Sequence, residues 1–124
     1  MKTAIIVLSD PKSGSEESLG RLFNALALAA ESNAAGDEVD IVFAGAGTRW
    51  PAELTQLGHP ARELYDSVRP LVKGASCGCA DAFEARVGVE GSEVPLLTDN
   101  ALPGTSGMAS IRSYVADGWS TLLF

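Results

Sequence analysis

A chain of 124 residues suits a single domain and is long enough to bury a hydrophobic core. Hydrophobic residues make up 46% of the chain and charged residues 20%, which is typical of a globular protein and excludes a disordered one. The net charge of −7 disfavours binding to the phosphate backbone of nucleic acid or to anionic lipid, so we expect neither a nucleic acid nor a membrane as partner.

The first segment, Lys2–Ser9, is an apolar run rich in β-branched residues that ends in a Ser-Asp-Pro turn. Such a run predicts a strand that is buried on both faces. It is shorter than the roughly 7–15 apolar residues of a signal peptide, and no segment approaches the roughly 20 residues that cross a bilayer. The chain has only two cysteines, which is too few for a disulfide scaffold, so we expect a cytoplasmic protein.

A long helix is predicted next, with Ser13 and Glu16 at the spacing of a capping box. Apolar residues that recur at three- and four-residue steps mark one face of this helix: Leu19, Leu22, Phe23, Leu26 and Ala30. Gly36 is well placed to end the helix, and the apolar segment Val39–Ala44 is the second predicted strand.

The loop after the second strand contains the sequence GAGTRW, which ends with Arg49 and Trp50. Gly45 and Gly47 match the first two glycines of a dinucleotide-binding motif, but Trp50 stands where the third glycine would be. Three interpretations stay open: a nucleotide site, a tight turn in which Trp50 covers an edge or a subunit contact, or one wall of a pocket around the cysteines.

The rest of the chain continues the alternation of strands and helices. The predicted elements are a helix that starts at Pro60 and carries an apolar stripe from Leu64 to Val72, a short strand Gly74–Ser76, a helix Ala80–Arg86, a strand Val94–Thr98, a polar loop Asp99–Gly107, a helix marked by Ile111, Tyr114 and Val115, and a last strand Trp119–Phe124. Strands separated by helices imply right-handed crossovers. We therefore predict a single three-layer α/β domain over residues 1–124, with a mostly parallel five-stranded sheet flanked by helices on both faces.

Both cysteines, Cys77 and Cys79, lie in the segment SCGCADAFEA. A structural zinc site needs four ligands, and one C-x-C pair with the distant His59 does not supply them, so we expect no metal. A disulfide between the two cysteines would close a small strained ring and suits a reactive redox state better than a structural link. Two buried thiols that only pack are the alternative.

The predicted position of Cys79 favours a reactive thiolate. Cys79 lies at the expected start of a helix, where free N–H groups and the helix dipole stabilise a negative charge, and Gly78 allows a tight turn that leaves the sulfur approachable. Asp81 and Glu84 oppose this, and no cation stands beside the thiol in the sequence. Any activating cation must therefore come from elsewhere in the fold. Because functional groups gather at the carboxyl ends of parallel strands, Arg49 is the candidate for it if its loop forms a wall of the cysteine pocket.

Three segments, SCGCADAFEA, VPLLTDN and SIRSYVADGWSTLLF, resemble the DsrE/DsrF-like sulfur-relay family. The resemblance implies a parallel-sheet α/β domain, assembly into trimers or hexamers, and relay of persulfide sulfur through one cysteine. The CAxAF pattern of this family falls on residues 79–83, which implies that Cys79 bears the sulfur. The first cysteine of the related pattern falls on Ser76, and Cys77 would then act as a neighbouring resolving thiol.

The sequence thus predicts a DsrE-like persulfide carrier or sulfurtransferase without a cofactor. The predicted site consists of two catalytic residues, Cys79 and Cys77, and of four binding residues, Arg49, Trp50, Ser76 and Gly78. The expected partners are further copies of the chain, in a trimer or hexamer, and a protein that donates or accepts sulfur. Two alternatives stay open: a non-catalytic oligomeric module whose cysteines only pack, or a protein that binds a small ligand or nucleotide at the carboxyl edge of the sheet.

Overall fold

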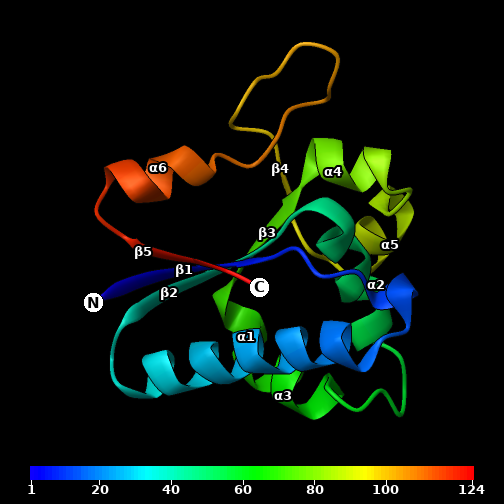
Figure 1. The fold of residues 1–124 in the computed structure, drawn as a ribbon. Helices are drawn as coiled ribbons and strands as arrows, with labels where there is room; N and C mark the ends of the chain where they lie inside the picture. Colours follow the sequence, from blue (N-terminus) through cyan, green and yellow to red (C-terminus); the bar gives the residue numbers. More distant parts are fainter.

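A computed structural model describes residues 1–124 and contains one five-stranded sheet in which every strand is parallel to its neighbours. The strands are β1 (Lys2–Val7), β2 (Glu38–Phe43), β3 (Val72–Ser76), β4 (Leu96–Leu97) and β5 (Ser120–Leu123), in the order β4-β3-β2-β1-β5. The predicted single α/β domain with a five-stranded parallel sheet is confirmed. The N-terminus lies at the start of β1, and the C-terminus lies at the opposite end of the neighbouring parallel strand β5 (Figure 1).

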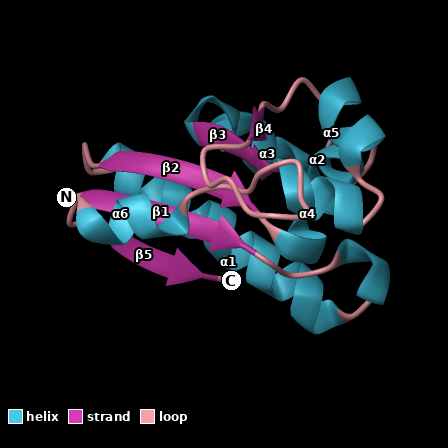
Figure 2. Ribbon diagram, turned by 90° about the horizontal axis from the view of Figure 1, so that it is seen from above, coloured by secondary structure: helices cyan, strands magenta, loops and turns pink.

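Helices lie on both faces of the sheet. They are α1 (Glu16–Ala34), α2 (Trp50–Leu54), α3 (Arg62–Val68), α4 (Cys77–Ala82), α5 (Arg86–Gly91) and α6 (Ile111–Ala116), with short 3-10 turns η1 (Pro11–Ser13), η2 (Gly45–Arg49) and η3 (Arg69–Leu71). Helices α1 and α3 cover one face and α6 lies on the other (Figure 1). Seen from above, the strands point towards the side of the molecule where α4 lies (Figure 2).

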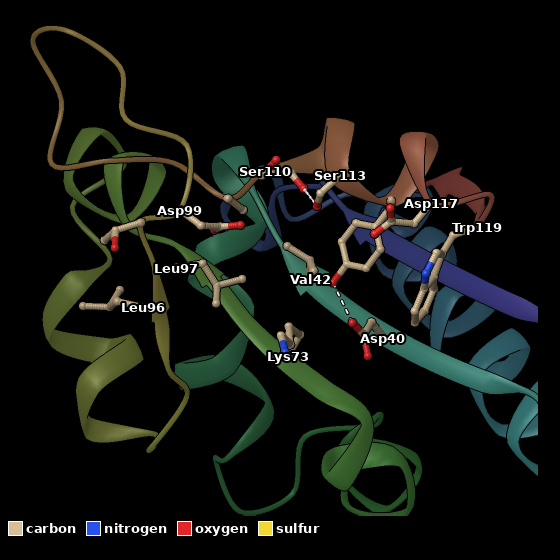
Figure 3. Close-up of a pocket in the computed structure, with 13 residues that line it drawn as sticks. Asp40, Val42, Lys73, Leu96, Leu97, Asp99, Ser110, Ser113, Asp117 and Trp119 are labelled. Carbon is tan, nitrogen blue, oxygen red and sulfur yellow. Dashed lines mark hydrogen bonds between the residues drawn. The ribbon is translucent and has the colours of Figure 1, made fainter.

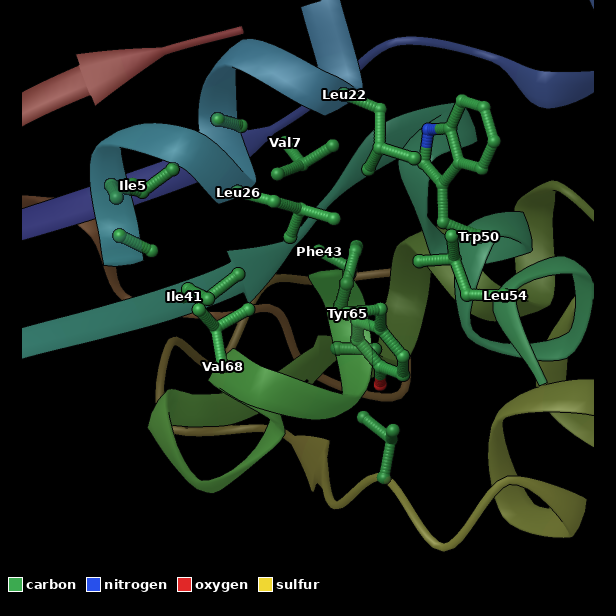
Figure 4. Close-up of a cluster of buried hydrophobic side chains, with 14 of the residues drawn as sticks. Ile5, Val7, Leu22, Leu26, Ile41, Phe43, Trp50, Leu54, Tyr65 and Val68 are labelled. Carbon is green, nitrogen blue, oxygen red and sulfur yellow. The ribbon is translucent and has the colours of Figure 1, made fainter. Parts of the chain in front are cut away.

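The main core lies between the sheet and helices α1 and α3, and Figure 4 shows its largest side chains. Alternate residues of β1 point to opposite faces, so Ile5 enters this core while Ile6 enters a smaller cluster on the α6 side. Both side chains are fully buried. Burial on both faces is the reason why β1 reads as a continuous apolar run.

Three local predictions at helix ends were wrong. The helix expected from Pro60 with a stripe to Val72 spans only Arg62–Val68, and Val72 begins β3. The N-cap of α1 is Ser15, whose hydroxyl oxygen accepts a hydrogen bond from the Ser18 amide at 3.0 Å, while Ser13 uses its hydroxyl to bond the Asp10 carbonyl instead. The helix expected over Ala80–Arg86 ends at Ala82, because the chain turns at Glu84 with a φ of 55° before α5 begins.

The strand expected at Val94–Thr98 is reduced to Leu96–Leu97. Pro95 has no N–H to donate to a ladder, so regular pairing with β3 begins only after it.

None of the helices combines the length and the apolar character that a membrane crossing requires.

Candidate functional site

Cys77 lies where strand β3 passes directly into helix α4, of which it is the first residue. Its thiol is 3% exposed and has two polar neighbours. A guanidinium nitrogen of Arg86 lies 2.9 Å from Sγ, and the hydroxyl oxygen of Ser106 lies 3.2 Å from it. The guanidinium can stabilise a negative charge on this sulfur, whereas the single hydroxyl hydrogen of Ser106 is donated to Asp81, so this hydroxyl can only accept from the thiol.

Asp81 holds these two neighbours in place. Its carboxylate accepts hydrogen bonds from Arg86 Nε at 2.6 Å and from the Ser106 hydroxyl at 2.5 Å. Those two bonds, with that of Arg86 the stronger, lower the pKa of Asp81 to about 2. Asp81 is therefore ionised at neutral pH and anchors the guanidinium instead of accepting a proton.

The same contacts act on Arg86. Its pKa is raised, first by the hydrogen bond to Asp81 and then by the negative charge that Cys77 can carry. Arg86 is thus a permanent cation beside the sulfur. The negative charge that we expected Asp81 to impose on the thiol is offset by this guanidinium.

Cys79 has different surroundings although it lies only two positions further along. Two residues in a helix are about 200° apart around the axis, so the Cys79 side chain leaves α4 on a different side from Cys77. It is the third residue of the helix and not the first, it is 9% exposed, and its sulfur takes part in no hydrogen bond. A disulfide between the two cysteines would require α4 to unwind locally.

Ser76 and Gly78 join the cysteine segment to the loop that follows β4. The Ser76 hydroxyl oxygen accepts a hydrogen bond from the Ala109 amide at 3.0 Å, and the Gly78 amide donates to the Gly107 carbonyl at 2.7 Å. A side chain at position 78 would collide with Met108. The absence of a side chain at Gly78 therefore lets this loop pack closely over the helix. Gly78 does not make the tight turn that the sequence predicted.

Arg49 and Trp50 direct their polar groups to partners other than the two sulfurs. The Arg49 guanidinium bonds the Asp10 carboxylate at 3.1 Å and the Phe83 carbonyl at 3.1 Å, and it makes no hydrogen bond with either cysteine. Arg49 thus ties the loops after β1 and β2 to the end of α4. The loops that follow β1, β2 and β3 do meet at the carboxyl edge of the sheet, but the cation beside the Cys77 thiol is Arg86 and not Arg49.

Trp50 is a core residue, 2% exposed, whose indole N–H donates to the Ser9 carbonyl at 2.8 Å. Its burial excludes the subunit contact that the sequence left open for it. The glycines of GAGTRW also have local roles: Gly45 has a φ of 55°, and a side chain on Gly47 would collide with the Val7 carbonyl.

A separate cleft of about 500 Å³ lies between α6 and the sheet, and Figure 3 shows its lining. Four charged residues line it: Asp40, Lys73, Asp99 and Asp117. The Tyr114 hydroxyl donates to Asp40 at 2.7 Å, and burial followed by this carboxylate raises the pKa of Tyr114. Three carboxylates against one ammonium give the cleft a net negative charge, which favours a cationic ligand over an anionic one such as a nucleotide.

No group of three or more His, Cys, Asp or Glu side chains is arranged to hold a metal ion. The imidazole of His59 has a local role instead, because its Nδ1 accepts a hydrogen bond from the Ala61 amide at 3.1 Å. The structure therefore gives no metal ligand set around either cysteine.

Arg86 and Ser106 were missed as site residues, although one signal for the network exists in the sequence. Cys77 and Asp81 are four positions apart, which places both side chains on one face of a helix if the helix begins at Cys77.

In comparisons with known proteins, no family model, curated protein or solved structure matches the chain. These comparisons therefore assign no family to the chain.

Proposed function

We propose that this protein is a DsrE-like sulfur carrier in which a cysteine of α4 accepts a sulfane sulfur and passes it on. The observation that supports this proposal best is the guanidinium of Arg86 at 2.9 Å from the Cys77 sulfur. The sequence resemblance pointed to Cys79, but the charged neighbours that a reactive thiolate needs surround Cys77. We therefore assign the sulfur-bearing role to Cys77.

The proposed step is an attack of the Cys77 thiolate on the outer sulfur of a donor persulfide, R–S–SH. A new S–S bond forms on Cys77, the S–S bond of the donor breaks, and the donor leaves as the thiolate R–S⁻ with the electron pair of the broken bond. The products are the Cys77 persulfide and the donor thiolate, so no oxidant or reductant is consumed. Arg86 stabilises the negative charge before the attack.

The loaded sulfur is then passed to an acceptor thiol of another molecule. Attack by Cys79 on the Cys77 persulfide would form the internal disulfide, and the helical geometry of α4 opposes it. The acceptor and donor are therefore separate thiol-bearing partners, and Cys79 contributes to the packing of the helix. As in DsrE-like proteins, we propose that the chain acts as a homo-oligomer and in the cytoplasm.

Access to the sulfur depends on the loop between Asn100 and Met108. This loop is closed at its base by the backbone pairing of Asn100 with Met108, and it places Ser106 over the thiol. Next to it a crevice of about 360 Å³ is lined by Gly78, Asp81 and Ser106, among others. With Cys77 only 3% exposed, a donor reaches the sulfur when the loop moves away from α4.

Intact-mass analysis after incubation with a small organic persulfide tests the proposal. We expect the wild-type protein to gain one sulfur atom, Cys79→Ser to gain it as well, and Cys77→Ser to gain none, because only Cys77 has a cation to hold the thiolate. A small acceptor thiol that is added afterwards should remove the extra sulfur atom from Cys77.

The outcomes separate the alternatives. Loss of loading in Cys79→Ser alone would return the role to Cys79. A wild-type protein that stays unloaded while its fold is intact by circular dichroism would favour a module whose cysteines only pack.

A further inference from the structure

Strand β5 is an edge strand without the features that usually protect an edge. It is the last strand of the order β4-β3-β2-β1-β5, so nothing pairs with its outer side. The opposite edge, β4, is only two residues long and follows Pro95, both of which discourage pairing with another chain. The segment that contains β5, Trp119–Phe124, has neither a proline nor a charged residue.

The hydrogen-bonding direction of β5 follows from its last contacts. The Phe124 amide donates to the Ile6 carbonyl, and the Phe124 carbonyl accepts from the Leu8 amide, so the backbone of Phe124 faces β1. In a strand the direction alternates with each residue. The N–H and C=O groups of Thr121 and Leu123 therefore point outwards, away from the sheet.

Apolar side chains are exposed along the same edge. Leu122 is 41% exposed and Leu123 is 62% exposed, on opposite faces of the sheet, and Leu8 beside them is 41% exposed. Unpaired backbone groups flanked by exposed leucines are what a strand from another chain would cover.

We propose that β5 pairs antiparallel with β5 of a second copy of this chain, about a two-fold axis. The edge is complementary to itself, which supports a second copy as the occupant, because the outward N–H and C=O groups of Thr121 can meet those of Leu123 in the other chain. Charge restricts two copies to this edge. Each chain carries a net charge of −7, so two copies repel one another over most of their surface, whereas residues 118–124 contain no charged side chain. The edge is where two such chains can meet without like-charge repulsion.

The two-fold axis fixes the register. With the outward groups of Thr121 and Leu123 bonded to those of Leu123 and Thr121 in the second copy, Leu122 lies directly opposite Leu122 of that copy. The two sheets then form one continuous sheet of ten strands. On one face Leu122 covers Leu122 of the second copy, and on the other face Leu123 lies opposite Thr121 of that copy. This contact is independent of the proposed sulfur chemistry, and it gives assemblies with an even number of chains.

Disulfide trapping tests this register. In Leu122→Cys the new thiols face one another across the axis at a separation that a disulfide can bridge, so mild oxidation should convert most of the protein to a covalent dimer. In Ser120→Cys, another exposed position of the same strand, the two thiols lie about 13 Å apart at a rise of roughly 3.3 Å per residue, and the protein should stay uncrosslinked. Equal cross-linking of both variants would contradict the register.

Light scattering of the unmodified protein tests the contact itself. We expect an even-numbered assembly that dissociates at least tenfold more readily in Leu123→Lys, because this change places two like charges diagonally across the axis on one face of the strand pair. Val87→Lys, which changes an 85% exposed valine elsewhere, should leave the assembly unchanged. A monomer at all concentrations, a trimer, or an assembly that is insensitive to Leu123→Lys would overturn the proposal.

Discussion

Two cysteines one residue apart differ in their surroundings because a helix turns them to different sides. Cys77 faces a guanidinium, a hydroxyl and, behind them, the Asp81 carboxylate. Cys79 is buried without a polar partner for its sulfur. The difference in reactivity that we expect between them therefore follows from charge, and not from exposure, since both are largely covered.

Replacement of Arg86 tests this difference. In Arg86→Ala the alkylation of Cys77 by iodoacetamide at neutral pH should slow about tenfold, because the cation that holds the thiolate is removed. Arg86→Lys should restore part of the rate, since it keeps the charge but cannot bond Asp81 through a planar fork. The rates are measured by quenched mass spectrometry of the Cys77 peptide.

Arg62→Ala is the matched control, because Arg62 also pairs with an aspartate on a short helix, 3.7 Å away, but has no contact with either cysteine. An unchanged rate in Arg86→Ala, with the fold intact, would contradict the role assigned to the guanidinium.

At the scale of elements, the turn η2 positions the cysteine helix. Arg49, at the end of η2, bonds the Phe83 carbonyl just after α4, and the same guanidinium bonds Asp10 in the loop after β1. This arrangement requires η2 to pass close to the end of β1, where Gly47 lies against the Val7 backbone. The glycines of this turn therefore support the site indirectly, through close backbone packing and not through a bound nucleotide.

Two glycine substitutions test the packing of η2. Gly47→Ala should lower the free energy of unfolding by about 2 kcal/mol or more, because the new methyl group meets the Val7 carbonyl oxygen and the backbone must shift. Gly20→Ala, within α1 and with no atom near the added methyl group, should raise the free energy of unfolding by about 0.5–1 kcal/mol. Urea denaturation measures both, and a neutral Gly47→Ala would show that η2 does not depend on this contact.

At the scale of the whole molecule, the parallel sheet was predictable because strong patterns encode it. The β-branched run of β1 and the long apolar stripe of α1 are local signals, and both elements lie where the sequence placed them. The carboxyl edge of the sheet then gathers the loops that follow β1, β2 and β3, as expected for parallel strands.

The composition of the site could not be predicted in the same way. Arg86 reaches Cys77 only because the chain reverses at Glu84, whose positive φ no residue pattern announces. Ser106 reaches it because a loop of nine residues folds back over α4, and polar loops give no signal for where they fold. Arg49 lies at the edge of the sheet where the sequence placed it, but its guanidinium bonds the Asp10 carboxylate and not a cysteine sulfur.

The central claim, that Cys77 is the reactive sulfur of this protein, is tested most directly by alkylation of the native wild-type chain with a small excess of iodoacetamide, followed by peptide mapping. Trypsin leaves both cysteines in one peptide, so fragment ions must separate label on Cys77 from label on Cys79. We predict that nearly all early label is on Cys77, because Arg86 lies 2.9 Å from its sulfur while the Cys79 sulfur has no polar partner. Label that appears first on Cys79, or on both at equal slow rates, would contradict the account.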